Sequence, residues 1–197
     1  MNKALSAPFT SAARPAAAIR FRTAGIVLGG SALVAICAHV SLPLYFTPVP
    51  LTLQPFAVLL LGLLLSPRLA AATLGTYLLE GALGLPVFAA GAPLTAGMTH
   101  LFGPTGGYLL AYPLAAAIVS FLWNRTRRGF VTAFVSAAAG SLAILASGAL
   151  WLTIFFHGSA HLALTLAVLP FLPGDALQVA AAAAAATGLR RRLRAAA

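Results

Sequence analysis

The chain of 197 residues has only two acidic residues, Glu80 and Asp175. Asp175 follows Pro173 and Gly174 and opens the run "DALQVAAAAAAATG". The turn residues predict that Asp175 lies at or just inside a helix N-terminus, where free N–H groups and the helix dipole favour a negative charge. Its carboxylate can cap that helix or accept hydrogen bonds from a ligand, and the residues alone leave both roles open.

Glu80 interrupts a second apolar run, "LGTYLLEGALG". A carboxylate at membrane depth costs at least about 2.5 kcal/mol, so it persists where a partner or a cavity stabilises it. Helix packing or a hydrogen bond to a neighbouring hydroxyl explains Glu80 as well as ligand contact does, and both interpretations remain open.

The composition excludes an ordinary soluble domain, because 61% of the residues are hydrophobic and only 7% are charged. Soluble domains are about half apolar and about a quarter charged. The sequence also lacks an H-E-x-x-H motif, a cysteine pair and a P-loop. We therefore expect an all-α polytopic membrane protein without a metal or other cofactor, which does not hydrolyse ATP through a P-loop.

Uncharged apolar runs predict six transmembrane helices, since about 20 residues cross a bilayer core. The second run is short, and the preceding "TPVPLTLQPF" is expected to carry it deeper as extended or re-entrant backbone. The expected spans cover residues 24–42, 51–65, 69–85, 105–123, 130–156 and 174–189.

The 12 Lys and Arg residues fall in the two terminal segments and in alternate loops between these spans. The positive-inside rule then places both termini in the cytoplasm and explains the net charge of +10 without nucleic acid as a partner. A cleaved signal peptide is the competing interpretation of the first span. The expected organisation is a cytoplasmic tail (1–23), a six-helix substrate-binding domain (24–189) and a basic cytoplasmic tail (190–197).

The outer loops collect most of the prolines and three of the four histidines, and both acids lie near that face. Gly106 and Gly107 open the fourth expected span in "GPTGGYLLAYPL". Their small size allows either an anion at the helix N-terminus or a closely packed neighbouring helix.

Four segments match a family pattern in their order and spacing: "TPVPLTLQPFAVLLLGLLLSPRLA", "YLLEGALGLPVFAAG", "LFGPTGGYLLAYPLAA" and "LPFLPGDALQVA". Together they resemble the BioY family, the biotin-binding S components of energy-coupling factor (ECF) transporters, over about residues 30–185.

The resemblance implies a six-helix S component of the bacterial inner membrane that takes up biotin through a pocket near the outer face. It also implies a coupling membrane protein and ATPase subunits as partners, although some members are thought to act alone. In this family the acid of the P-G-D motif is a pocket residue. The substrate-binding residues expected within the matching motifs are Gln54, Glu80, Phe88, Gly106, Gly107, Tyr108, Asp175 and Gln178.

Two positions depart from the family pattern. Gln178 stands where a lysine is usual, so the biotin carboxylate loses a charged partner and has neutral hydrogen bonds instead. Ser31 and Ala35 occupy the A-x-x-x-A motif that docks the coupling partner. A carrier for another vitamin-like ligand and an intramembrane enzyme are the alternatives, and the enzyme lacks an acid and base pair.

Overall fold

The computed structural model describes residues 16–89, 97–155 and 160–196. The regular elements of these residues are helices and two short antiparallel strands, in which Ser41 pairs with Thr52 and Leu42 with Leu51. In chain order the elements are α1 (Ala16–His39), β1 (Ser41–Leu42), β2 (Leu51–Thr52), α2 (Gln54–Leu64), α3 (Pro67–Ala82), α4 (Met98–Leu101), α5 (Gly106–Asn124), α6 (Phe130–Phe155), α7 (Ala160–Ala167) and α8 (Leu172–Ala195).

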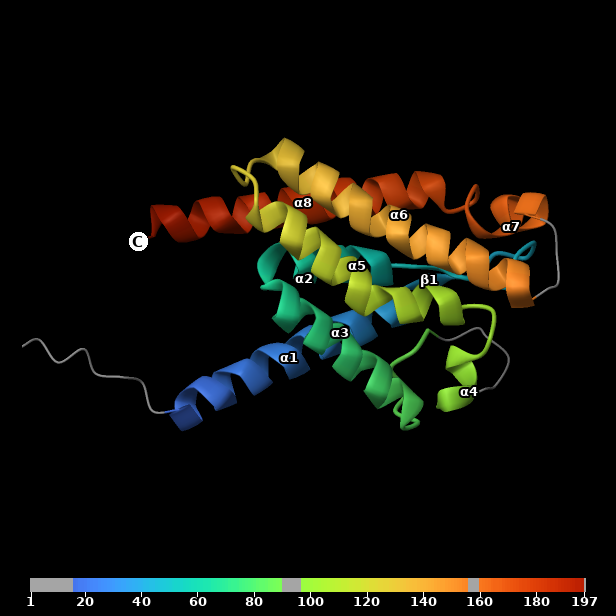
Figure 1. The fold of residues 1–197 in the computed structure, drawn as a ribbon, viewed down its shortest axis with the longest axis horizontal. Coiled ribbons are helices and arrows are strands. Elements are labelled where there is room, and N and C mark those ends of the chain that lie inside the picture. Colours follow the sequence, from blue (N-terminus) through green and yellow to red (C-terminus); the bar gives the residue numbers. More distant parts are fainter. Residues whose placement is uncertain (1–15, 90–96, 156–159, 197) are drawn as a thin grey trace, which may run out of the picture.

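Helix α5 lies at the centre of the bundle, in contact with α2, α3 and α6 (Figure 1). Helix α8 packs on α2 and α6, while α1 crosses α2 and α3. The buried core consists largely of Leu, Val, Ala and Tyr side chains from these helices. The all-helical prediction is therefore confirmed for the described residues, except for the short strand pair.

Three of the described helices are long and apolar enough to cross a membrane: Ala17–His39, Gly106–Asn124 and Phe130–Ile154. They correspond to the first, fourth and fifth expected spans. Helix α2 has 11 residues and is preceded by extended backbone at Leu51–Thr52, as its short apolar run predicted. Such a helix rises about 16 Å, roughly half of a bilayer core.

The helices differ from the expected spans mainly at their ends. Helix α1 begins at Ala16 and α8 continues to Ala195, so residues 16–23 and 190–195 are helical. Ala, Leu and Arg are strong helix formers, and Arg192 and Arg194 in the last turn complement the helix dipole. The expected loops 86–104 and 157–173 contain the short helices α4 and α7.

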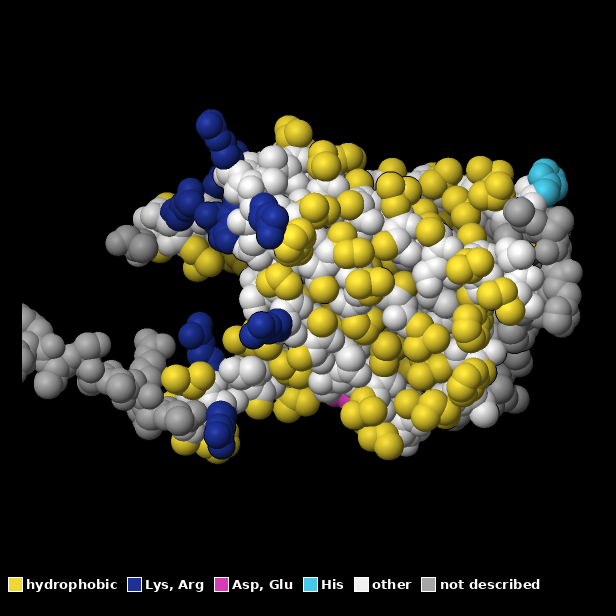
Figure 2. All heavy atoms as spheres, viewed as in Figure 1, with side chains coloured by type: hydrophobic (Ala, Val, Ile, Leu, Met, Phe, Trp, Pro, Cys, Tyr) yellow, Lys and Arg dark blue, Asp and Glu magenta, His cyan; other side chains and the backbone are white. Residues whose placement is uncertain are grey.

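Basic side chains gather at one end of the molecule, and an apolar surface covers its middle (Figure 2). The start of α1, the α5–α6 connection and the end of α8 lie at this basic end (Figure 1). The β1–β2 connection, α4 and α7 lie toward the other end, where the Thr47 hydroxyl donates to the Leu166 carbonyl at 2.9 Å.

The N-terminus of α2 is capped by a residue far away in the sequence. The first N–H groups of a helix have no partner within it, and Leu53 at the N-cap supplies no side-chain bond. Pro55 has no N–H, but the Phe56 N–H donates to Gln178 Oε1 at 2.9 Å. The other end of the same amide, Gln178 Nε2, donates to the Thr52 carbonyl at 3.0 Å. One side chain on α8 thus holds both the end of β2 and the start of α2.

Replacing Gln178 with Ala should therefore destabilise the protein even without a ligand. The change leaves a half-buried N–H and a carbonyl unpaired, which costs about 1–3 kcal/mol. Thermal unfolding of purified protein in detergent measures the effect, with Leu177→Ala as the control because Leu177 is 72% exposed on the same helix. Equal unfolding midpoints for the two variants would show that the amide does not support α2.

Candidate functional site

A cavity with an empty volume of about 700 Å³, including its open mouth, lies among the first turns of α2, α5 and α8 and the middle of α6. Volumes of about 300–1,000 Å³ are typical of small-molecule sites. Its described lining residues are Val49, Pro50, Leu51, Thr52, Gln54, Pro55, Ala89, His100, Thr105, Tyr108, Leu109, Tyr112, Ile144, Leu145, Phe171, Asp175 and Gln178.

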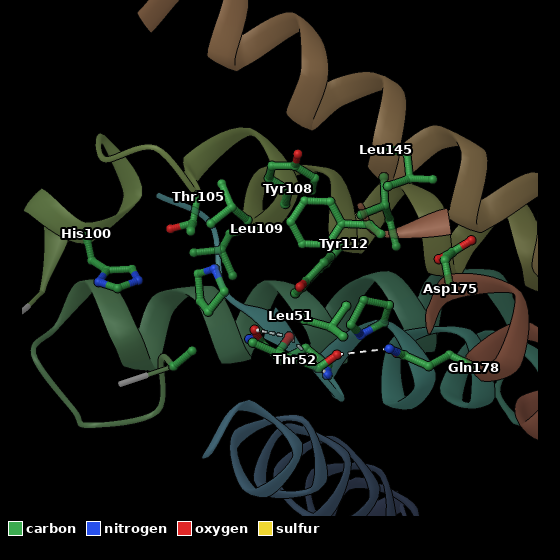
Figure 3. A pocket seen from close by; sticks show the side chains of 17 residues that line it. Leu51, Thr52, His100, Thr105, Tyr108, Leu109, Tyr112, Leu145, Asp175 and Gln178 are labelled. Atoms are coloured by element: carbon green, nitrogen blue, oxygen red, sulfur yellow. Dashed lines mark hydrogen bonds between the residues drawn. The ribbon is translucent and has the colours of Figure 1, made fainter. Parts of the chain in front are cut away.

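The walls are mainly aliphatic and aromatic, and the polar groups are few. Figure 3 shows Asp175 at one end of the cavity and His100 at the other, with Tyr112 and Leu109 between them. The first turns of three helices contribute to the lining, and helix N-termini favour groups that carry negative charge. The cavity is thus suited to an elongated, largely apolar ligand with a polar group at each end.

Asp175 lies in the first turn of α8, as predicted, and its carboxylate reaches across to α6. The Ser141 hydroxyl lies 2.5 Å from both carboxylate oxygens. Helix α8 has no side-chain cap, so Asp175 does not serve as the N-cap that the sequence left open. A carboxylate has about four lone-pair sites, and one serine proton leaves it able to accept further bonds from the cavity.

Gln54 is buried at the cavity wall and belongs to a chain of hydrogen bonds. Its Nε2 donates to the Tyr77 hydroxyl at 2.6 Å, and that hydroxyl donates to the Val87 carbonyl at 3.0 Å. The Thr52 hydroxyl donates to Gln54 Oε1 at 3.1 Å. This network joins β2, α2, α3 and the segment after α3, and it fixes the orientation of the amide at the wall.

Gln178 also lines the cavity, close to Thr52 (Figure 3). Its amide is engaged by the backbone at Thr52 and Phe56, as described above. Gln178 therefore lies at the cavity wall with its Oε1 and one of its two N–H groups already bonded within the protein. One N–H group remains for a ligand acceptor.

A further donor, the Thr105 hydroxyl, lies in the cavity lining at the His100 end. The His100 ring is buried and stacks on Phe88, with ring centroids 4.9 Å apart. The Thr105 hydroxyl is buried at the start of α5 and has no hydrogen-bond partner among the described residues. Because an unpaired buried hydroxyl is costly, a ligand acceptor at this position would gain a bond that the protein alone does not make.

Tyr108 combines burial with a place in the lining. Its ring lies against Gly148 of α6, where an added Cβ would come within 2.2 Å of ring atoms. The Phe171 ring, at the start of α8, lies 6.1 Å from it between centroids. Two aromatic rings from separate helices thus form one apolar wall.

Four of the residues predicted from the sequence lie outside the cavity lining. The Phe88 ring stacks on the His100 ring and contacts the Tyr77 ring in a T-shaped arrangement. Glu80 accepts a hydrogen bond from the Ser31 hydroxyl of α1. Gly106 and Gly107 pack against their neighbours: a Cβ on Gly107 would lie 2.2 Å from the Trp151 Cβ. The structure thus places these glycines in helix packing, and it places Glu80 in the hydroxyl bond that the sequence offered as an alternative.

The expected docking residues lie on α1 in different environments. Ser31 is fully buried and bonded to Glu80, so its side chain faces the bundle. Ala35 is partly buried against the core.

Sequence reasoning missed several cavity residues, including Thr52, His100, Thr105, Tyr112 and Phe171, and it missed Ser141, which bonds to Asp175 but is not in the described lining. His100 and Thr105 lie in the segment rich in Pro and Gly that the sequence assigned to the outer face. Ser141 carried a weaker signal: it is a buried hydroxyl in an apolar helix and must find an acceptor. Only the fold shows that this acceptor is Asp175.

Comparisons with known proteins agree with this architecture. The chain is 38% identical over 151 residues to the probable biotin transporter BioY of Pyrococcus horikoshii, covering 77% of this chain and 85% of that protein. It is 35% identical over 161 residues to the biotin transporter BioY of Thermotoga maritima, covering 82% and 91%.

A solved structure shares the fold. The crystal structure of the S component for biotin from an ECF-type ABC transporter matches with a TM-score of 0.80 and 24% sequence identity, over 88% of this chain and 93% of that one.

The model of the BioY family matches residues 10–195, nearly the whole chain. The relatives are transporters, which confirms the expectation that the protein is not an enzyme. With its long apolar helices and shared architecture, this chain belongs to the BioY family of membrane transport proteins.

Proposed function

We propose that the protein captures biotin in the cavity described above and serves as the S component of an ECF-type transporter. The observation that carries the proposal is the cavity itself: residues from the shared motifs line it, and Asp175 and His100 lie at its opposite ends. The biotin-transporting relatives and the related fold support biotin as the ligand.

The two ends of the cavity suggest how biotin lies in it. The ureido ring of biotin carries N–H donors, and Asp175 offers carboxylate oxygens that can accept them. The biotin carboxylate then points toward the His100 end of the cavity, where the unpaired Thr105 hydroxyl at the start of α5 is available as a donor. The aliphatic part of the ligand passes between Tyr112 and Leu109.

The same proposal includes the orientation in the membrane. The proposed spans are α1, α2, α3, α5, α6 and α8, and the positive-inside rule favours the basic end in the cytoplasm of a bacterial cell. The cavity would then lie near the outer face of the inner membrane. The proposed energy source for uptake is a coupling membrane protein with ATPase subunits, because the fold resembles the S component of an ECF-type transporter; uptake by this protein alone is the alternative.

Asp175→Asn tests the ureido contact. Ser141 can still donate to the Asn oxygen, so we expect a normally folded protein. Loss of a hydrogen bond to a charged group costs about 1.5–3 kcal/mol, which corresponds to about a tenfold or greater loss of biotin affinity. Equilibrium binding of labelled biotin to the purified protein measures this loss.

Glu80→Gln is the matched control, because it makes the same chemical change at the acid outside the lining. We expect near-normal biotin affinity for this variant. Unchanged affinity in a well-folded Asp175→Asn variant would exclude the ureido contact. If neither variant nor the parent protein binds biotin, the ligand is a different small molecule.

Thr105→Val tests where the carboxylate lies. The substitution keeps the shape and removes the unpaired hydroxyl. We expect about a tenfold weaker binding of biotin and a smaller effect on an uncharged biotin amide, because bonds to a charged acceptor are roughly twice as strong. Thr76→Val is the control, since its hydroxyl donates to Ala72 within α3. Equal losses for biotin and its amide would place the carboxylate elsewhere.

Single cysteines test the orientation. In a Cys37→Ala background, Tyr45→Cys in the exposed β1–β2 connection should react with a membrane-impermeant maleimide in intact cells. Arg127→Cys in the exposed α5–α6 connection should react only after the cells are permeabilised. Labelling of both variants in intact cells would contradict the proposed topology.

A further inference from the structure

A second hollow lies at the basic end of the molecule, where the α5–α6 connection meets the last turns of α8. It has an empty volume of about 380 Å³, including the space open to solvent. Its described lining residues are Arg128, Gly129, Phe130, Thr187, Arg190, Arg191 and Arg194. Four of these seven residues are arginines, and they come from two separate parts of the chain.

The described lining of the hollow carries four arginines and no acidic side chain. On α8, Arg194 lies four residues after Arg190 and three after Arg191, so it faces both of them, and like charges at these spacings repel. Desolvation and the charges of Arg194 and Arg128 lower the pKa of Arg190. The only two acidic side chains of the sequence, Glu80 and Asp175, bond to Ser31 and Ser141, so neither of them balances these arginines.

Arg128 is held in place rather than left free to swing away. Its backbone has a φ of 54°, in the left-handed region that residues other than glycine seldom adopt. Its guanidinium donates to the Asn124 side-chain oxygen at the end of α5. Helix α6 begins immediately afterwards at Phe130, and the N-terminus of a helix also favours an anion.

The border of the hollow is apolar. Phe130 and Phe134 lie one turn apart on α6, with ring centroids 6.4 Å apart, and are 46% and 37% exposed. Leu189 and Leu193 are 45% and 64% exposed on α8. The apolar surface of the bundle therefore continues to the edge of the arginines (Figure 2).

We infer that this hollow binds the phosphate headgroup of an anionic membrane phospholipid, whose acyl chains lie along the exposed apolar side chains of α6 and α8. Basic pockets between membrane helices on the cytoplasmic side suit such headgroups. A free phosphate could satisfy the arginines, but it would make no use of the apolar border. The lipid thus supplies the missing counter-charge and ties the end of α8 to the start of α6.

The test compares two double variants that lose the same charge. Arg190→Gln/Arg194→Gln removes two arginines from the hollow, whereas Arg20→Gln/Arg22→Gln removes two exposed arginines from α1. Binding of phosphatidylglycerol to the purified full-length chain is measured by native mass spectrometry and by lipid-dependent thermal stabilisation. Phosphatidylcholine and inorganic phosphate serve as the comparison ligands.

We expect phosphatidylglycerol to bind the hollow variant about tenfold more weakly than the parent protein, since each arginine near an anionic headgroup contributes substantially. The α1 variant should bind it almost normally, and both variants should unfold near the parental temperature in the absence of lipid. Equal losses in the two variants would overturn the inference in favour of unspecific attraction. Equal stabilisation by inorganic phosphate would overturn it in favour of a free-anion site.

An acidic surface of a partner subunit is the remaining occupant to distinguish. If the hollow variant kept its affinity for phosphatidylglycerol and lost its association with coupling and ATPase subunits, the hollow would be a protein-docking surface and the lipid inference would be wrong. This experiment does not depend on biotin binding, so its result and the result of the biotin assays can be separated.

Discussion

Within the apolar body of this protein, a buried polar group depends on a partner inside the chain or on a bound ligand, because a hydrocarbon surrounding offers none. The start of α2 shows the consequence most clearly. Its Phe56 N–H would lack an acceptor, but Gln178 reaches it from α8, 122 residues later, and binds the Thr52 carbonyl with the same amide. That pair of bonds sets the position of the extended segment before α2, and this segment forms one wall of the cavity.

The same requirement explains why the two acids can exist here. Each carboxylate accepts a bond from a serine on a different helix: Asp175 from Ser141 of α6 and Glu80 from Ser31 of α1. These bonds join helices that are distant in the sequence. The difference lies in what else surrounds each acid, since Asp175 also borders open space and Glu80 does not line the cavity. One acid is therefore available to a ligand, while the other serves helix packing in this structure.

Sequence reasoning reached the helical fold because apolar runs and the distribution of Arg are strong local signals. The ends of α5 and α6 lie within one residue of the expected spans 105–123 and 130–156. It could not place the start of α1 or the end of α8, because both helices continue outside the apolar run through Ala and Arg residues that favour helix. For the site, four of the eight residues expected to bind substrate line the cavity: Asp175, Gln178, Gln54 and Tyr108. Their role in binding stays a prediction. The residues that depend on pairing between distant helices, such as Ser141, have no signature that a single sequence reveals.

Gln178 shows how a departure from a family pattern can be absorbed by the structure. A lysine side chain is a donor only, so it could bind the Thr52 carbonyl but could not accept the Phe56 N–H as the glutamine amide does. The glutamine therefore strengthens the frame of the cavity, and it leaves the described lining without a Lys or Arg. In the proposed binding mode, a negative ligand group therefore meets hydrogen-bond donors and the N-termini of α2, α5 and α8, whose first turns contribute to the cavity. Because partial charges act over a short range, such a site discriminates by the position of the acceptor more than by its net charge, and the unpaired Thr105 hydroxyl marks one such position.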